Sequence, residues 1–356
     1  MKDSHGQKLS TLCVAALLAL GGSLVMLRAA ADPAPSRDQA SLVTLGKQLF
    51  FDTRLSADGK TSCASCHRPE HAYTDNQAVA RGVSGLTGTR NTPSLLNVPA
   101  AGALFWDGRR EKLEEAVLDP LAHPRELAFS DDATLDAVMR SPAYGRSMAD
   151  AFGGKAGVSA WRPRIGLALA AYIKSLPHPE SAFDSYQAQH NLSAFNQQAL
   201  EGLRLFSGKA GCASCHRIEG SPARFTDDRF HATGTGLQKV ARNLPALTSQ
   251  ATAIATDGAT VGCEIAAHAD LAATGRFMVT HQPADIGLFR TPSLRYVAQT
   301  APYMHDGSVA TLEDAVDQEV YWRGLSSGHP VSLTVSERQA LIVFLRSLSS
   351  DSAATH

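Results

Sequence analysis

The pentapeptide Cys63-Ala64-Ser65-Cys66-His67 occurs a second time in the chain, as Cys212-Ala213-Ser214-Cys215-His216. The C-x-x-C-H spacing lets two thiols add to the vinyl groups of a haem while the adjacent histidine ligates the iron as its proximal ligand. The alternative is a pair of zinc knuckles or redox dithiols, because C-x-x-C alone also suits those sites. A histidine directly after the second cysteine is not the usual zinc spacing. We therefore expect two covalent haem c groups, with His67 on the first iron and His216 on the second.

The composition is that of a globular protein with room for two domains. The chain has 356 residues, of which 44% are hydrophobic, enough for two buried cores. Its 33 basic and 34 acidic residues give a formal net charge of -1. This balance gives no electrostatic reason to expect nucleic acid or an anionic membrane surface as a partner. Partners therefore have to be inferred from the sites.

The N-terminus has the pattern of an export signal. Lys2 and Lys8 precede an apolar stretch from Leu9 to Leu27, and Ala29-Ala30-Ala31 fits an A-x-A cleavage site. We interpret residues 1–31 as a signal peptide, with an uncleaved N-terminal anchor as the alternative, because the stretch approaches the roughly 20 residues that span a bilayer. Either reading places the remainder outside the cytoplasm, as haem c attachment requires, and predicts a periplasmic protein.

Further segments repeat at one constant separation of 199 residues. They are Thr92-Pro93-Ser94-Leu95 with Thr291-Pro292-Ser293-Leu294, Asp107-Gly108 with Asp306-Gly307, and Leu113-Glu114-Glu115-Ala116-Val117 with Leu312-Glu313-Asp314-Ala315-Val316. A constant register indicates two copies of one supersecondary unit. The haem pentapeptides are only 149 residues apart, so the second half contains an insertion, around residues 231–277. Because it is rich in Ala, Thr and Gly, we expect it to form surface loops.

Apolar periodicity predicts helices and no convincing strand. The expected helical segments are Leu42–Phe50, Lys112–Leu118, Leu135–Met139, Ala168–Leu176, Ala194–Phe206 and Ala340–Leu348. Thr334 and Glu337 form a capping-box pair before the last of them. We therefore predict a mainly α fold with two cytochrome c-like haem domains related by internal duplication. They would occupy residues 41–180 and 193–350, with a linker around Pro177–Ser193.

With these residues in view, the chain resembles the bacterial di-haem cytochrome c peroxidase and MauG family over nearly all of its length after the export signal. Besides the two pentapeptides, the resemblance rests on Leu45-Gly46-Lys47, Arg90-Asn91-Thr92-Pro93, Phe105-Trp106-Asp107-Gly108-Arg109 and Ala301-Pro302-Tyr303-Met304-His305-Asp306-Gly307. It implies that the first haem reacts with hydrogen peroxide and that the second is an electron reservoir.

The resemblance also gives individual residues roles. Trp106 would lie between the haems as an electron relay, at the place that His305 takes in the second half; a packed core aromatic is the alternative. Glu126 would move a proton between the peroxide oxygens, which heterolysis requires; considered alone it would be a solvated loop charge. Asn91, Thr300 and Pro302 match ligands of one calcium ion, bound through oxygen donors that suit this hard cation. Ordinary turn residues are the alternative for these three.

The sequence departs from typical peroxidases of the family at both irons. The segment Ala80–Gly85 lacks the histidine that caps the first haem in the resting oxidised state, so an open position is expected there. No methionine follows Met304 to ligate the second iron. Glu319 stands at the matching count after His305, but the segment Val316–Gly324 is two residues longer than in relatives of the family, which would make Tyr321 the distal ligand, a MauG-type choice. An anionic oxygen donor favours ferric over ferrous iron.

Two further residues receive structural interpretations. His71 lies only four residues after the proximal His67, and we interpret it as structural. Cys263 is left over after Cys13 is removed with the signal peptide, and we interpret it as a buried free thiol.

Three functions fit these observations. The first is a MauG-like enzyme that uses hydrogen peroxide to form a high-valent state shared by both haems and oxidises a tryptophan or tyrosine of a partner protein. Ala210 replaces the surface tryptophan that MauG carries before its second haem motif, so the exit route need not be the same. The second is a cytochrome c peroxidase that takes electrons from a small cytochrome or cupredoxin. The third, a non-catalytic di-haem electron carrier, is disfavoured because a carrier gains nothing from an open iron beside Glu126.

Overall fold

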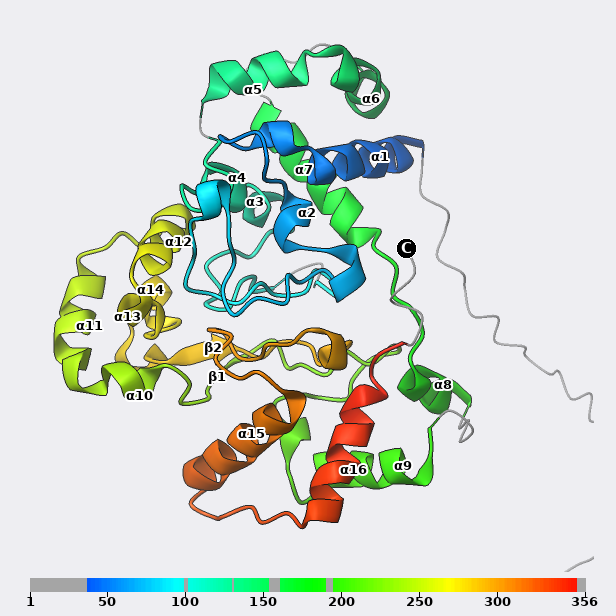
Figure 1. Ribbon diagram of the computed structural model, residues 1–356, viewed down its shortest axis with the longest axis vertical. Coiled ribbons are helices and arrows are strands. Elements are labelled where there is room, and N and C mark those ends of the chain that lie inside the picture. Colours follow the sequence, from blue (N-terminus) through cyan, green and yellow to red (C-terminus); the bar gives the residue numbers. More distant parts are fainter. Residues whose placement is uncertain (1–36, 99–101, 130, 154–160, 190–194, 351–356) are drawn as a thin grey trace, which may run out of the picture. The chain divides into compact units, whose positions relative to one another are not determined.

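The apolar stretches of the sequence fold into helices that are joined by long loops (Figure 1). The structure is a computed structural model and describes residues 37–98, 102–129, 131–153, 161–189 and 195–350. The prediction of a mainly α fold is confirmed. The proposed signal peptide, residues 1–31, lies outside the described residues. Within the described ranges, no helix has the length and apolar character that a membrane crossing requires.

The α-helices are α1 (Arg37–Phe51), α2 (Cys63–Cys66), α3 (Leu113–Ala116), α4 (Asp119–Ala122), α5 (Asp132–Met139), α6 (Pro142–Phe152), α7 (Trp161–Lys174), α8 (Ala182–Gln189), α9 (Gln197–Ser207), α10 (Leu237–Val240), α11 (Leu244–Thr252), α12 (Gly258–Ala267), α13 (Ala269–Ala272), α14 (Phe277–Thr280), α15 (Leu312–Ser327) and α16 (Val335–Arg346). Short 3-10 helices are η1 (Thr53–Leu55), η2 (Pro69–His71), η3 (Val83–Gly85), η5 (Cys212–Ser214), η6 (Ala241–Asn243), η7 (Pro283–Asp285) and η8 (Val297–Gln299). The predicted capping box is confirmed at α16, where Thr334 and Glu337 bond reciprocally.

The expectation of no strands is wrong in one place. Strand β1 (Phe230–Ala232) pairs antiparallel with β2 (Leu288–Arg290), and Phe230 lies opposite Arg290. Each strand has three residues, too few to show an alternating pattern in the sequence.

The first hydrophobic core forms where α1 packs on α7. Leu45 and Leu49 of α1 are buried together with Ile165 of α7. Gly46 stands at the crossing, because a methyl group there would lie 1.9 Å from the carbonyl oxygen of Ala168. Only glycine lets the two backbones approach this closely.

The second core has the same construction, with α9 packed on α16. Phe206 and Phe344 are buried with ring centroids 5.1 Å apart. Gly202 stands at this crossing, where a methyl group would lie 2.1 Å from the carbonyl oxygen of Ala340. Each half of the chain thus closes its core with a glycine-mediated contact between an early and a late helix.

The insertion in the second half is helical, and the prediction of surface loops is wrong. Helices α10 to α14 enclose a third core of their own, which includes Leu247, Val261 and Ile265 (Figure 1). Alanine is the strongest helix former, so the alanine content that suggested loops instead favours helices. The insertion also contacts the first half, where the hydroxyl of Thr89 donates to the carbonyl oxygen of Ile265 over 2.6 Å.

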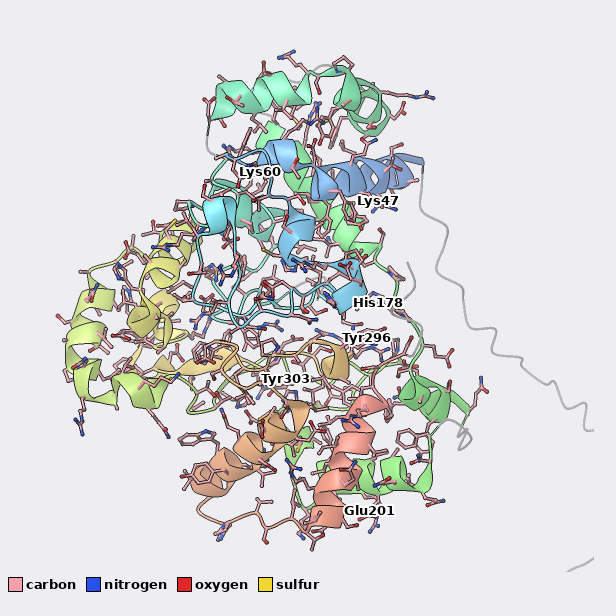
Figure 2. The ribbon with its side chains drawn as sticks, in the orientation of Figure 1. Lys47, Lys60, His178, Glu201, Tyr296 and Tyr303 are labelled. Carbon is pink, nitrogen blue, oxygen red and sulfur yellow. The ribbon has the colours of Figure 1, made fainter. Side chains whose placement is uncertain are left out.

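The chain between the two halves is tied to the second. The Tyr296 hydroxyl donates to the carbonyl oxygen of Pro179, 2.7 Å away and next to His178 (Figure 2). Asp184 of α8 accepts two hydrogen bonds from Arg295, at 2.7 and 2.6 Å. Residues 36–356 form one compact unit, so the domain boundaries at 41–180 and 193–350 stay a prediction.

Candidate functional site

The first pentapeptide forms the single helical turn α2. The Ser65 hydroxyl accepts the backbone N–H of Ser62 at 3.0 Å, and the N–H of His67 donates to the carbonyl oxygen of Cys63 at 2.9 Å. The Nδ1 atom of His67 lies 2.9 Å from the carbonyl oxygen of Tyr73, and a carbonyl can only accept. Nδ1 therefore carries the proton, and Nε2 keeps the lone pair that iron ligation needs.

The second pentapeptide repeats this arrangement at η5. The N–H of His216 donates to the carbonyl oxygen of Cys212 at 3.0 Å, and its Nδ1 lies 3.0 Å from the carbonyl oxygen of Phe225. Burial lowers the pKa of both His67 and His216, which favours the neutral imidazole. Two equivalent histidines with their Nδ1 atoms bonded to backbone carbonyls fit proximal haem ligands.

The repeated Thr-Pro-Ser segments support these histidines in the same way. The Ser94 hydroxyl donates to the carbonyl oxygen of Ala72 at 2.6 Å, just before Tyr73. The Ser293 hydroxyl donates to the carbonyl oxygen of Arg224 at 2.7 Å, just before Phe225. The sequence repeat therefore corresponds to a repeated contact that positions the histidine's carbonyl partner.

The cysteines lie in surroundings that disfavour thiolates. Burial raises the pKa of the Cys63 and Cys66 thiols to about 12 and that of Cys212 to about 11. Zinc ligands and redox-active dithiols need lowered pKa values, because the thiolate is the reactive form. Neutral thiols that become thioethers with a haem fit these surroundings better.

Glu126 lies near the first haem motif. Its charge raises the pKa of both Cys63 and Cys66, after the larger effect of their burial. Its carbonyl oxygen accepts the N–H of Val83 at 2.8 Å, in the segment Ala80–Gly85 that lacks a capping histidine. The side chain of Glu126 is 38% exposed. The structure thus brings the predicted catalytic carboxylate and the histidine-free segment together.

His123 is a neighbour of Glu126 that sequence reasoning missed. Its Nδ1 accepts the N–H of Arg125 at 3.1 Å and lies 3.8 Å from the Glu126 carboxylate, while its Nε2 contacts the carbonyl oxygen of Gly262 at 3.2 Å. The sequence feature that could have identified His123 is its position three residues before Glu126. The partner on α12 comes from the insertion, 139 residues away. Cys263 is the next residue, a free thiol that is only partly buried, contrary to the prediction of a buried one.

Trp106 and His305, which occupy matching places in the repeat, both bond to the backbone of Asn91. The indole N–H of Trp106 donates to the carbonyl oxygen of Asn91 at 2.9 Å, and the N–H of Asn91 donates to the carbonyl oxygen of His305 at 2.9 Å. The carbonyl oxygen of Trp106 accepts the N–H of Arg290, from β2, at 2.8 Å. Trp106 therefore contacts backbone from both halves of the chain.

His305 is buried in a neutral form. Desolvation, together with the charge of Arg90, lowers its pKa to about 3. Its Nδ1 accepts from the Arg90 guanidinium at 2.9 Å, and its Nε2 lies 3.0 Å from the carbonyl oxygen of Thr235. The imidazole stacks on Phe289 with ring centroids 3.7 Å apart. These contacts leave neither ring nitrogen available as a ligand.

The three predicted calcium ligands lie on segments that meet through Asn91 and His305. The Asn91 amide is oriented by donation from its Nδ2 to the carbonyl oxygen of Gln77 at 2.9 Å. Pro302 borders a pocket of about 650 Å³ that is also lined by Glu70, His71 and Asn76 of the first half. The amide Nδ2 of Asn76 donates to Nδ1 of His71 at 3.0 Å, in agreement with a structural role.

Helix α15 carries both candidates for the distal ligand of the second haem. Burial raises the pKa of the Cys212 thiol, and the negative charge of Glu319 raises it further. The side chain of Tyr321 is 59% exposed, and its ring centroid lies 5.4 Å from that of Trp322. A helix turns by about 100° per residue, so these two side chains point about 160° apart, to nearly opposite sides of the helix. Of the two, Glu319 is the one whose charge acts on a cysteine of the second haem motif.

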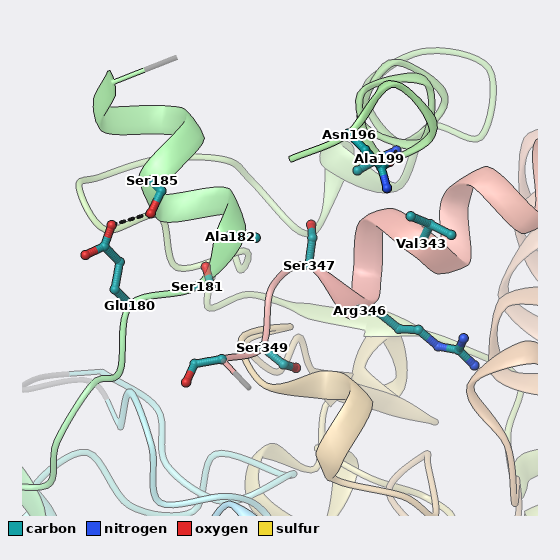
Figure 3. Close-up of a pocket in the computed structure, with 11 residues that line it drawn as sticks. Glu180, Ser181, Ala182, Ser185, Asn196, Ala199, Val343, Arg346, Ser347 and Ser349 are labelled. Carbon is teal, nitrogen blue, oxygen red and sulfur yellow. Dashed lines mark hydrogen bonds between the residues drawn. The ribbon is translucent and has the colours of Figure 1, made fainter. Parts of the chain in front are cut away.

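Another pocket, of about 510 Å³, lies among α8, α9 and α16 (Figure 3). It is lined mainly by small polar residues, and Glu180 accepts a hydrogen bond from Ser185 at its edge. None of the predicted site residues lines it.

Comparison with known proteins agrees with this geometry. The family model described as di-haem cytochrome c peroxidase matches residues 40–192. The methylamine utilization protein MauG of Methylorubrum extorquens is 34% identical over 319 residues, covering 88% of this chain and 79% of that protein. The cytochrome c551 peroxidase of Nitrosomonas europaea is 34% identical over 280 residues, covering 79% and 73% respectively. The solved structure of a MauG-like protein associated with microbial copper homeostasis is 30% identical, with a TM-score of 0.70 over 90% of this chain and 92% of that one. The chain therefore belongs to the di-haem cytochrome c peroxidase family, and it is a peroxide-dependent oxidoreductase of the type that carries two c-type haems.

Proposed function

We propose that this protein is a MauG-like enzyme that uses hydrogen peroxide to oxidise a tryptophan or tyrosine of a partner protein. The observation that carries the proposal is the pairing of Glu126 with a segment, Ala80–Gly85, that contains no histidine and is joined to it by the backbone hydrogen bond from Val83. Such a site can meet peroxide in its fully oxidised state. The lack of any methionine after Met304 also separates the second haem from that of a typical peroxidase.

The residues around the first haem would manage protons. When bound, the haems supply the redox chemistry, in which hydrogen peroxide takes up two electrons and two protons and leaves as two molecules of water. Glu126 would take a proton from one peroxide oxygen and return it to the other. His123 and Val83 hold its backbone in place, through bonds of 3.0 and 2.8 Å. Because these two bonds hold the backbone of Glu126, they support a defined position for its carboxyl group.

Trp106 would pass oxidising equivalents between the two halves. Two hydrogen bonds support this role: the indole N–H donates to the carbonyl oxygen of Asn91, and the carbonyl oxygen of Trp106 accepts the N–H of Arg290 from the other half of the chain. Asn91, Thr300 and Pro302 would hold one calcium ion beside it through a side-chain oxygen and two carbonyl oxygens. The matched contacts of Ser94 and Ser293 support an origin of the two halves by duplication. The apolar segment near the N-terminus supports a periplasmic location.

A second candidate is a cytochrome c peroxidase that takes its electrons from a small cytochrome or cupredoxin. The similarity to the cytochrome c551 peroxidase of Nitrosomonas europaea favours it. This reading predicts rapid steady-state turnover with a small electron donor, whereas the MauG-like reading predicts slow turnover with such donors.

The two candidates differ in how the fully oxidised enzyme behaves. We would first confirm two covalent haems by mass spectrometry of the denatured protein. We would then mix the ferric enzyme with one equivalent of hydrogen peroxide, without reductant, and follow both haems by stopped-flow absorbance. The MauG-like reading predicts a prompt change at both haems. A ferric enzyme that ignores peroxide until it is partly reduced, and then turns over rapidly with reduced cytochrome c, would establish the peroxidase instead.

A further inference from the structure

Helix α15 presents one of its faces to the second haem motif. Arg323 donates a hydrogen bond of 2.6 Å to the hydroxyl of Ser214, inside the pentapeptide. A methyl group at Gly211 would lie 2.7 Å from the same guanidinium. Glu319 lies four residues before Arg323, and side chains four residues apart share a helix face. The contact of Arg323 therefore directs Glu319 toward the same motif.

The neighbouring face of α15 is held by the loop at residues 234–235. Gln318 donates to the hydroxyl of Thr235 at 2.8 Å, and a methyl group at Gly234 would lie 2.5 Å from the ring of Trp322. With both faces fixed, the rotation of α15 about its own axis is determined. The side chain of Glu319 consequently cannot exchange places with that of Tyr321 without loss of these contacts.

The side chain of Glu319 is exposed, and Arg323 is its charged neighbour. Among the described residues, none donates a hydrogen bond to this carboxylate. Its oxygens are therefore free to bind a cation.

Tyr321 lies on the outer face of α15 together with Leu325, which is 55% exposed, and with the exposed Asp314. Tyr321 is the expected ligand only if two extra residues shift the register of this segment. The helix shows no irregularity between Leu312 and Ser327 that would absorb them.

We propose that Glu319, and not Tyr321, is the side chain that α15 presents to the distal side of the second haem, as an oxygen ligand to its iron. This assignment rests on the proposed function only in that it requires a haem at His216. A carboxylate is an anionic oxygen donor, so it stabilises ferric iron relative to ferrous iron and keeps the reduction potential of that haem low. A haem held in this way gives up electrons readily to the first.

The test compares single variants of the complete holoenzyme, each first shown by mass to carry two covalent haems. In Glu319→Gln, loss of the anionic ligand should change the electron paramagnetic resonance spectrum of the ferric second haem and raise its midpoint potential. Tyr321→Phe, two residues away on the same helix, should leave both unchanged. Glu319→Met should introduce the red charge-transfer band of sulfur-ligated ferric haem and raise the potential further, because methionine favours ferrous iron.

The outcomes decide the assignment without measuring catalysis. An unchanged spectrum and potential in both Glu319 variants would overturn it, and so would a changed spectrum in Tyr321→Phe. Glu319→Met keeps the test decisive if Glu319→Gln folds poorly, since a new sulfur band can arise only if position 319 reaches the iron. Failure of the proposed function would appear elsewhere, in the reaction with peroxide, and would leave these resting spectra as predicted.

Discussion

Several residues of the proposed sites are positioned by hydrogen bonds of the backbone. The carbonyl oxygen of Asn91 accepts from Trp106 and its N–H donates to His305, so the backbone of one residue connects the two residues that distinguish the halves of the repeat. Glu126 likewise owes its position to bonds of its own backbone with Val83 and His123. Conservative substitutions can therefore change the chemistry of these side chains without moving the backbone.

Replacing Glu126 by glutamine should slow the reaction with peroxide and leave the resting enzyme almost unchanged. The amide retains the shape of the side chain and the backbone bonds, but it cannot accept and return a proton. Loss of general acid–base help typically lowers rates by about 10²–10⁴. Stopped-flow absorbance after addition of hydrogen peroxide measures this rate.

Glu264→Gln is the matched control for that variant. Glu264 is a carboxylate on α12 that lies 3.9 Å from His268 and is part of neither haem site. It should react with peroxide at the parental rate. A parental rate in Glu126→Gln as well would show that another group moves the proton.

At the scale of elements, the two pairs of crossed helices depend on glycine. Gly202 of α9 meets the backbone of α16, while Gly145 of α6 is exposed and has no atom within 4 Å of the position of a methyl group. The same substitution should therefore have opposite effects at the two positions.

Gly202→Ala should destabilise the holoprotein, because the new methyl group would lie 2.1 Å from the Ala340 carbonyl oxygen and would force α9 and α16 apart. Overpacking of this kind costs about 1–3 kcal/mol or more. Gly145→Ala should be neutral or stabilising by up to about 1 kcal/mol, since alanine favours helix. Urea unfolding followed by circular dichroism measures both. Equal free energies of unfolding for the two variants would mean that α9 and α16 can move apart at little cost.

A buried ion pair fixes α8 to the segment before η8. Burial raises the pKa of Asp184, but hydrogen bonds from Arg295 and Ser181 outweigh this and hold it below 3.8. Arg295 is itself only 4% exposed. Asp184→Asn should therefore cost about 3–5 kcal/mol, because it leaves a buried guanidinium without its counter-charge.

The same pair predicts a dependence of stability on pH. Since the folded pKa of Asp184 lies below its unfolded value, the unfolded chain binds the proton more readily, and the contribution of the pair is complete above about pH 4. It is lost as the pH falls through the folded pKa. Urea unfolding at pH 7 and pH 3 should show a smaller decline for Asp184→Asn than for the parent. Asp150→Asn, which removes an exposed partner of Arg146, should behave like the parent.

At the scale of the whole molecule, the first half, the second half and the helical insertion meet around the proposed sites. Trp106 contacts Asn91 and β2, and α12 of the insertion contacts His123 beside Glu126. The surroundings of Trp106 and Glu126 are therefore completed by residues that come from the second half of the chain.

Trp106→Phe should leave the first haem reactive toward peroxide and delay oxidation of the second. Phenylalanine lacks the indole N–H that bonds to Asn91 and is much harder to oxidise. Rapid mixing with peroxide, with each haem followed at its own wavelength, measures the delay. Trp161→Phe removes a tryptophan from the core, where its indole donates to Asp136 at 2.8 Å, and should show no delay. Simultaneous oxidation of both haems in Trp106→Phe would exclude the relay.

The sequence alone determined those features that depend on local spacing. The two pentapeptides, the repeat at 199 residues, the capping box at Thr334 and the family resemblance are all readable without coordinates, because each concerns a few adjacent residues or a constant separation. The helical content followed from apolar periodicity for the same reason. The helices of the insertion were missed because their alanine and glycine content was interpreted as loop, although it packs into a core of its own.

Only the tertiary structure determined which segments far apart in the sequence lie beside the proposed site residues. His123 needs Gly262 from a segment 139 residues away, and Trp106 needs Arg290 from β2. The proposed assignment of Glu319 in place of Tyr321 rests on the rotation of α15, which is set by its contacts with Ser214 and Thr235. A two-residue difference in sequence counting reverses the direction of a helical side chain, so counting alone could not settle it. Contacts between distant segments fix that rotation, and these contacts exist only once the chain has folded.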